Sequence, residues 1–137
     1  MEKEFIPYEQ ALVLKELGFD EPCLAQYRKY DVGDATLDIG FSKNELISKF
    51  DNLSLFCSAP LYQQVFRWFR EKYGYFQLFD YQHGDSKINR GFFFNIVNID
   101  NEDFFFPEDF KNQIIYKTYE EAELECLKKL IEMVKGE

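Results

Sequence analysis

The stretch SAPLYQQVFRWFREKYG, from Ser58 to Gly74, is the clearest helix in the sequence and the segment around which we expect the fold to form. Pro60 suits the first turn of a helix, where no backbone N–H is needed, and Gly74 suits the position that closes one. One broad arc of this helix is apolar, and it comprises Leu61, Tyr62, Val65, Phe66, Trp68, Phe69 and Tyr73. Such a wide face must be covered by a sheet or by other helices, so the pattern predicts a core helix of a globular domain.

Two further helices are predicted near the ends of the chain. The first runs from Pro7 to Leu17 and is closed by Gly18, after which Phe19 can fold back on the last turn. The second begins at the N-cap Thr118, where Glu121 completes the spacing of a capping box, and it continues to Lys135.

A shorter helix and several strands are predicted between these helices. Ser42 and Glu45 also have capping-box spacing, so Ser42 is expected to begin a short helix through Phe50, although Glu45 to Phe50 would also serve as an irregular crossover. Alternating apolar residues and turn residues predict strands. The expected strands are Cys23 to Tyr30, Leu37 to Phe41, Leu53 to Cys57, Tyr75 to Gln82, Gly91 to Ile99 and Ile114 to Lys117, and Phe104 to Phe106 is a further short apolar run.

This element order predicts the α+β class. We expect a single domain over residues 1–137, with about three helices packed on one side of a mainly antiparallel sheet. Residues 1–57 contribute an N-terminal helix and a hairpin, and residues 58–137 contribute the central helix, strands and the closing helix.

The composition is rich in aromatic residues and acidic. Aromatic side chains make up 19% of the residues and the formal net charge is −9, with 11 acidic groups in residues 1–60 and 11 in residues 91–137. A phosphate backbone is repelled by such a surface, so no nucleic acid is expected as a direct ligand. The acidity also has a simpler interpretation, which is that it keeps an aromatic-rich protein in solution.

The cysteines and the N-terminus indicate a soluble cytosolic protein without a membrane segment. Cys23, Cys57 and Cys126 are odd in number and widely spaced, as expected for reduced, buried thiols. The N-terminus lacks the apolar region of a signal peptide, and no run approaches the ~18 apolar residues of a membrane span.

Four basic residues form the only candidate basic patch. Arg67 and Arg70 project from the polar face of the central helix, and Lys87 and Arg90 follow in the next loop. Such a patch could bind an acidic partner or a phosphate, although a solvated helix face is the simpler interpretation.

No catalytic, cofactor or metal site is predicted. The only histidine, His83, precedes Asp85 in a typical turn, and Cys57 has no histidine near it in sequence. Asp100 to Asp103 is the best carboxylate candidate for a metal ion, but it lacks the spacing and glycine of an EF-hand. Common nucleotide-binding, hydrolase and zinc-protease motifs are absent from the sequence.

Three segments together resemble a family of small uncharacterised proteins encoded by phages, prophages and mobile elements of Bacteroidetes-type bacteria. They are FIPYEQALVLKELGFDEPC (Phe5 to Cys23), CSAPLYQQVFRWFREKYG (Cys57 to Gly74) and TYEEAELECLKKLIEMVK (Thr118 to Lys135). The resemblance implies a phage-related accessory protein in the bacterial cytoplasm, and it supplies no functional residues.

The element order from Ser58 onward, helix, strands and helix, also looks like a double-stranded RNA-binding domain. That domain opens its last helix with lysines that contact phosphates, whereas this chain has Glu120, Glu121 and Glu123 in the corresponding turn. The resemblance therefore implies the fold without the RNA-binding function.

These observations lead to a non-enzymatic accessory protein that acts by protein–protein interaction. An acidic decoy or inhibitor of a host nucleic-acid-binding protein is one form of this hypothesis, with Glu121, Glu125 and Glu132 as its acidic face. The alternatives are a homodimeric or virion or replication accessory protein that uses exposed aromatic residues, and a small metal-dependent nucleotide or phosphoester enzyme.

Overall fold

The computed structural model describes residues 2–30, 33–49, 56–84, 90–100, 104–106 and 114–136. The chain forms two compact units, Met1–Val65 and Phe66–Glu137. The predicted α+β class is confirmed, and all strand pairs are antiparallel. The strands lie in two three-stranded sheets, one in each unit, where the sequence predicts one sheet. Strand patterns show which residues pair locally, but they do not show which pairs join into one sheet.

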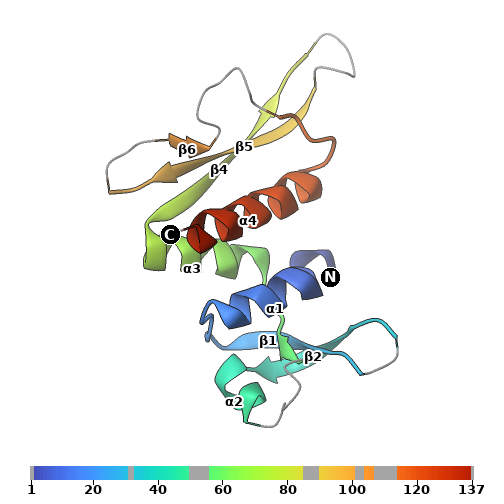
Figure 1. The fold of residues 1–137 in the computed structure, drawn as a ribbon. Helices are drawn as coiled ribbons and strands as arrows, with labels where there is room; N and C mark the ends of the chain where they lie inside the picture. The colour runs from blue at the N-terminus through green and yellow to red at the C-terminus, as the bar shows by residue number, and fades with distance from the viewer. Residues whose placement is uncertain are drawn as a thin grey trace. The chain divides into compact units, whose positions relative to one another are not determined.

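The first unit places one sheet between two helices. The sheet has the strand order β2-β1-β3, and Figure 1 shows α1 on one of its faces and α2 on the other. Its elements are η1 (Glu2–Glu4), α1 (Tyr8–Glu16), β1 (Cys23–Arg28), β2 (Thr36–Ser42), α2 (Asn44–Ser48) and β3 (Cys57–Ser58). The predicted strand from Leu53 lies outside the described residues up to position 55.

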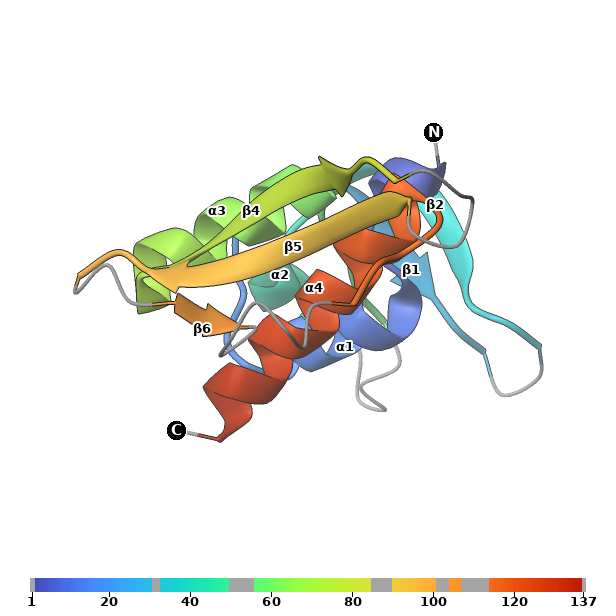
Figure 2. The ribbon, with the colours of Figure 1, turned by 90° about the horizontal axis from the view of Figure 1, so that it is seen from above.

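The second unit begins and ends with a helix and has strands between them, as the sequence predicts, but the third strand of its sheet is Phe104–Phe106 and not the predicted strand Ile114 to Lys117. Its sheet has the order β4-β5-β6, and Figures 1 and 2 show helices on one face of it. Its elements are α3 (Tyr62–Tyr73), whose first turn belongs to the first unit, β4 (Tyr75–Gln82), β5 (Gly91–Asn98), β6 (Phe104–Phe106) and α4 (Tyr119–Lys135).

Phe79 on β4 joins the layers of the second unit. Its ring lies 5.6 Å from the ring of Phe66 on α3, 5.1 Å from Tyr119 on α4 and 6.4 Å from Phe94 on β5. One aromatic side chain therefore contacts both helices and the neighbouring strand, so both helices pack on the same face of the sheet.

The helix ends follow the local sequence signals. Gly18 and Gly74 adopt positive φ angles of 96° and 75° directly after α1 and α3, and Phe19 donates its N–H to the carbonyl of Leu14. Thr118 Oγ1 accepts from the Glu121 N–H at 3.1 Å, which confirms it as the N-cap of α4. Pro60 lies two residues before α3 rather than in its first turn.

A β-bulge at Gly40 divides the side chains of β2 between the two faces of the first sheet. Ile39 pairs with Ala25, but the next pair is Cys23 with Ser42, so β2 holds one extra residue. Without the bulge, Ile39 and Phe41 would share a face, because strand side chains alternate. With it, Ile39 stays on the face toward α1 and Phe41 turns to the face toward α2.

A buried polar network joins the segments of the first unit. Asn44 donates from Nδ2 to the Phe19 carbonyl at 2.7 Å and accepts from the Ser58 N–H at 2.9 Å. Ser42 Oγ donates to the Ala25 carbonyl and lies 3.1 Å from Ser58 Oγ. One side-chain amide thus holds the start of α2 against both β3 and the turn after α1.

The prediction that Ser42 is the N-cap of the short helix is wrong, because Ser42 belongs to this buried network. α2 begins at Asn44, its N-cap is Lys43, and the Ser42 hydroxyl is engaged in the buried network instead. The Glu45 N–H is accepted at 2.7 Å by Oδ1 of Asp20, which is distant in the sequence. A tertiary contact therefore supplies the acceptor that a local cap would have supplied.

The backbone makes its closest approach in the second unit at Gly91. An isolated bridge joins Phe92 to Tyr116, with backbone hydrogen bonds of 2.8 and 2.7 Å, and this bridge is what forms within the predicted strand Ile114 to Lys117. A Cβ atom on Gly91 would lie 2.4 Å from the Tyr116 carbonyl oxygen.

We expect Gly91→Ala to destabilise the fold by about 2 kcal/mol, because the added methyl group must displace backbone rather than a flexible side chain. The free energy of unfolding in urea measures this loss. Gly136→Ala is the control, because its Cβ would meet neighbouring atoms no closer than 3.5 Å. Equal stability of the two variants would contradict the close approach.

We expect Asn44→Ala to lower the free energy of unfolding by about 3 kcal/mol, because it leaves a buried carbonyl and a buried N–H without partners. Asn44→Asp retains an acceptor for the Ser58 N–H but loses the donor to the Phe19 carbonyl. It should also destabilise the fold, because it places a buried carboxylate beside that carbonyl. Urea titration of both variants checks this, and a loss below about 0.5 kcal/mol for Asn44→Ala would contradict it.

Candidate functional site

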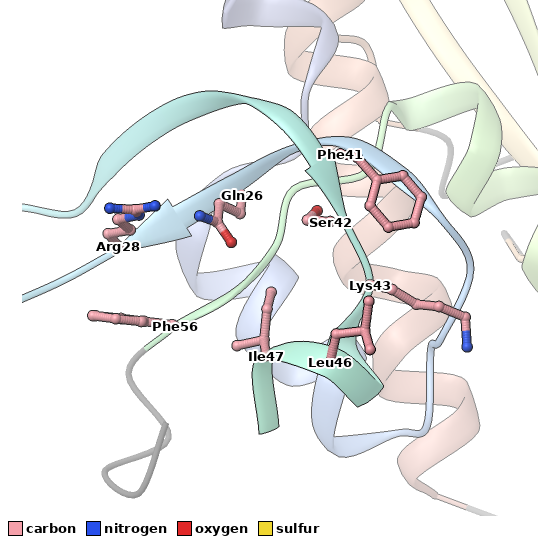
Figure 3. A pocket seen from close by; sticks show the side chains of 8 residues that line it. All are labelled: Gln26, Arg28, Phe41, Ser42, Lys43, Leu46, Ile47 and Phe56. Carbon is pink, nitrogen blue, oxygen red and sulfur yellow. The ribbon is translucent and has the colours of Figure 1, made fainter. Parts of the chain in front are cut away.

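The first unit contains a hollow of about 390 Å³ between the outer face of its sheet and α2. Its lining comes from three stretches of the chain, residues 26–28, residues 41–47 and Phe56, as Figure 3 shows. The lining residues are Gln26, Arg28, Phe41, Ser42, Lys43, Leu46, Ile47 and Phe56. This volume falls within the range of small-ligand and side-chain pockets.

The walls of the hollow are mainly apolar. In Figure 3, Leu46 and Ile47 of α2 lie opposite Gln26 of β1, with Phe41 and Phe56 at the two ends. Ile47 is buried, whereas Phe41 and Leu46 are exposed, so the hollow opens to solvent between them. The site can therefore accept an apolar group.

The two cations of the lining are neutralised by carboxylates. Arg28 Nε lies 3.1 Å from Asp38 Oδ2, and Lys43 Nζ lies 2.7 Å from Asp20 Oδ2 and 3.1 Å from Glu45 Oε2. The hydrogen bond from Lys43 lowers the pKa of Asp20, and the bonds to Asp20 and Glu45 raise the pKa of Lys43. In Figure 3 the Lys43 ammonium points away from the other lining side chains.

A second polar contact faces the hollow at Gln26. When its amide is rotated by 180°, its oxygen accepts from Nε and Nη2 of Arg28 at 3.0 Å. The Gln26 amide oxygen is then occupied by the Arg28 guanidinium.

Large exposed apolar side chains surround the hollow. Phe41 is 70% exposed, Leu24 64%, Tyr30 62% and Leu46 42%, and the Tyr30 ring lies 5.7 Å from the lining residue Phe56. These four residues are called the apolar patch. Leu24 shares the outer face of β1 with Gln26 and Arg28, since alternate strand residues face the same side.

The described residues around the hollow hold no catalytic pair. Cys23 of β1 is buried, and burial raises its pKa to about 11, so it carries little thiolate at neutral pH. The three cysteines are free and buried, as predicted. Within the described ranges, no group of three or more histidine, cysteine, aspartate or glutamate side chains could hold a metal ion.

The predicted basic residues are only partly described. Arg67 and Arg70 are exposed one turn apart on α3, and Arg90 is exposed directly before β5. Lys87 lies outside the described residues. A patch formed by all four stays a prediction.

The other candidate residues are similarly divided. His83 is exposed, and its ring lies 5.0 Å from the ring of Tyr81, while Asp85 lies outside the described residues. Asp100 donates its backbone N–H to the Asn98 side chain at 2.9 Å. The rest of the segment to Asp103 is not described, so its metal-binding capacity is untested.

Two carboxylates of the predicted acidic face of α4 form ion pairs with lysines. Glu125 lies 3.2 Å from Lys128 Nζ, and Glu132 lies 3.3 Å from Lys129 Nζ. Glu121 is exposed in the first turn, next to Glu120. Two of the three predicted carboxylates thus have lysine partners on their own helix.

Sequence reasoning missed the hollow because its lining is assembled by tertiary structure. Phe41 reads as one member of an alternating strand, and only Gly40 beside it signals a bulge that could change its face. No comparable signal marks Gln26 or Phe56.

Comparisons with protein-family models, with curated proteins and with solved structures find no match for this chain. The resemblance to phage-encoded proteins therefore stays a prediction. None of the helices in the described ranges has the length and apolar character needed to cross a membrane. Functional inference rests on the chain's own geometry.

Glu123 on α4 provides a test of the electrostatics of the second unit. Burial, with a contribution from Glu120, raises its pKa to about 7 from an ordinary value of 4.5. The folded state therefore binds this proton more tightly than the unfolded chain does. Its contribution to stability is complete below pH 4.5 and is lost as the pH rises through about 7.

We expect Glu123→Gln to be more stable than the wild type at about pH 8 and nearly equal to it at about pH 4, because the variant carries no charge to desolvate. The gain should be on the order of 1 kcal/mol, since the carboxyl is only half-buried and solvent screens it. Urea midpoints across this pH range measure the difference. Parallel pH profiles would contradict the raised pKa.

Proposed function

We propose that this chain is a non-enzymatic accessory protein that acts by binding another protein through the apolar patch of its first unit. The observation that carries the proposal is the exposure of Leu24, Tyr30 and Phe41, each more than 60% exposed, beside an open hollow. Burial of one such side chain contributes about 1.5–3 kcal/mol. Clusters of exposed apolar side chains are typical of interaction sites.

The chemistry of the hollow favours a protein partner over a charged metabolite. Arg28 and Lys43 already have carboxylate partners, so an anion would have to compete with them. An apolar side chain of a partner loses no such contact when it enters between Phe41 and Leu46.

The resemblance to phage-related proteins would place the binding partner in the cytoplasm of a bacterial host. A second candidate is an acidic decoy or inhibitor of a host nucleic-acid-binding protein, which would act through α4 instead of the apolar patch. The free carboxylate of that face would be Glu121, since Glu125 and Glu132 have lysine partners.

The test compares capture by the wild type, by Phe41→Ser and by a matched control, Leu78→Ser, which alters an exposed side chain of β4. Lysate of a Bacteroidetes-type gut bacterium, with and without phage infection, supplies the partners. A captured protein is identified, purified and titrated against each variant. We expect Phe41→Ser to weaken its binding about tenfold or more, equal to about 1.4 kcal/mol, and Leu78→Ser to leave it unchanged.

Salt separates the two forms of the proposal. Binding by the apolar patch should change little between about 0.05 and 0.5 M salt, whereas binding by the acidic face should fall steeply. Loss of binding in Glu121→Gln but not in Phe41→Ser would replace the apolar patch with α4. If no protein binds in either case, the proposed function is wrong.

A further inference from the structure

Three aromatic rings form an exposed cluster at one end of the sheet of the second unit. Tyr81 of β4 pairs with Phe92 of β5, and their rings lie 5.0 Å apart. The ring of Phe92 lies 5.7 Å from that of Tyr119 at the start of α4. Figures 1 and 2 show that α4 begins at the end of the sheet where β4 ends and β5 begins. Tyr81 is 37% exposed and Tyr119 is 41% exposed, so the cluster is open to solvent.

Two carboxylates of α4 lie close to this cluster. Glu123 follows Tyr119 by about one helical turn, so the two side chains share a face of α4, and Glu120 lies beside them. Burial, with a contribution from the charge of Glu123, raises the pKa of the Tyr119 hydroxyl. Burial, with a contribution from Glu120, raises the pKa of Glu123 to about 7. The tyrosine and the two carboxylates are therefore near enough to interact electrostatically.

The described residues supply no cation to these two carboxylates. Neither Glu120 nor Glu123 forms an ion pair with any residue that the structure describes, unlike the carboxylates farther along α4. A half-buried carboxylate that lacks a cation is unfavourable to ionise, and a cationic ligand would offset this cost. The faces of aromatic rings also attract cations. These side chains are called the ring-carboxylate site, which comprises Tyr81, Phe92, Tyr119, Glu120 and Glu123.

We propose that the ring-carboxylate site binds an arginine side chain of a partner protein. A guanidinium group is planar and carries several donors, so it can stack on a ring and donate to a carboxylate at the same time. A lysine ammonium is a point charge and combines the two contacts less well. An anionic segment is repelled, and an apolar segment leaves the carboxylates without partners. The site lies in the second unit, so it is distinct from the apolar patch through which the proposed function acts.

Glu121 distinguishes this site from the acidic character of α4 as a whole. It is exposed and lies two residues before Glu123, which places it roughly 160° away around the helix. It therefore shares a face with Glu125 and not with the rings of the site. Glu121→Gln and Glu123→Gln remove the same charge from the same helix, and only the second variant alters the site.

The probe is a synthetic glycine-rich peptide that carries two arginines and no apolar side chain. NMR titration of the intact chain at about pH 8, where Glu123 is mostly ionised, measures both binding and its location. We expect the peptide to shift the ring signals of Tyr81, Phe92 and Tyr119. The same peptide with citrulline, a neutral isostere of arginine, should bind at least about tenfold more weakly, and a lysine peptide about threefold more weakly.

Matched variants test the residues of the site. Glu123→Gln should weaken binding of the arginine peptide about tenfold, because it removes a charge-assisted contact, and Glu121→Gln should leave it within about twofold. Tyr119→Leu should weaken it about threefold, because leucine offers the cation no ring face. Tyr30→Leu, at an exposed ring of the first unit, is the matched control and should have no effect.

Two features keep the test independent of folding failure. Glu123→Gln is expected to be more stable than the wild type at this pH, and circular dichroism must show native structure for Tyr119→Leu. Equal binding of the arginine and citrulline peptides overturns the inference. An equal effect of Glu121→Gln and Glu123→Gln also overturns it, because the peptide would then respond to net charge alone.

The outcome is distinguishable from that of the proposed function. An arginine peptide that shifts no ring signal of the second unit, together with a partner lost in Phe41→Ser, rejects the ring-carboxylate site and retains binding through the apolar patch. Peptide binding that depends on Glu123 and Tyr119, together with no captured partner for the apolar patch, supports the ring-carboxylate site and rejects the proposed function.

Discussion

The buried side-chain amide of Asn44 is the contact on which the first unit depends. It donates to the Phe19 carbonyl after α1 and accepts from the Ser58 N–H of β3, so one side chain fixes α2 relative to both segments. A buried amide is stabilising only when both of its ends have partners. The position of α2 follows from this contact, and the hollow exists because α2 is held beside an otherwise open sheet face.

The second unit is organised differently, by aromatic rings instead of a polar network. Phe79 contacts both helices and β5. The backbones of Phe92 and Tyr116 form a bridge, and Gly91 lies against Tyr116. Ring contacts are tolerant of small shifts, whereas the amide network requires fixed distances. The unit with the stricter geometry is the one whose exposed apolar side chains lie beside the hollow.

The sequence predicts local structure well where one segment contains the whole signal. Gly18, Gly74 and Thr118 end or begin helices as their residue types indicate, and the strand pair on either side of His83 is also correct. It fails at Ser42, because a buried tertiary network outweighs a local capping preference. It also fails at the hollow, because three separate stretches of the chain form its walls and the bulge that exposes Phe41 depends on pairing with β1.

The burial of the three cysteines has a practical consequence for spectroscopy. Cys23, Cys57 and Cys126 are inaccessible in the fold, and burial raises the pKa of Cys23 and Cys126. Thiol-reactive dyes and spin labels attack exposed thiolates. A single cysteine introduced on the surface would therefore be labelled selectively in the native chain, without replacement of the natural thiols that fill its core.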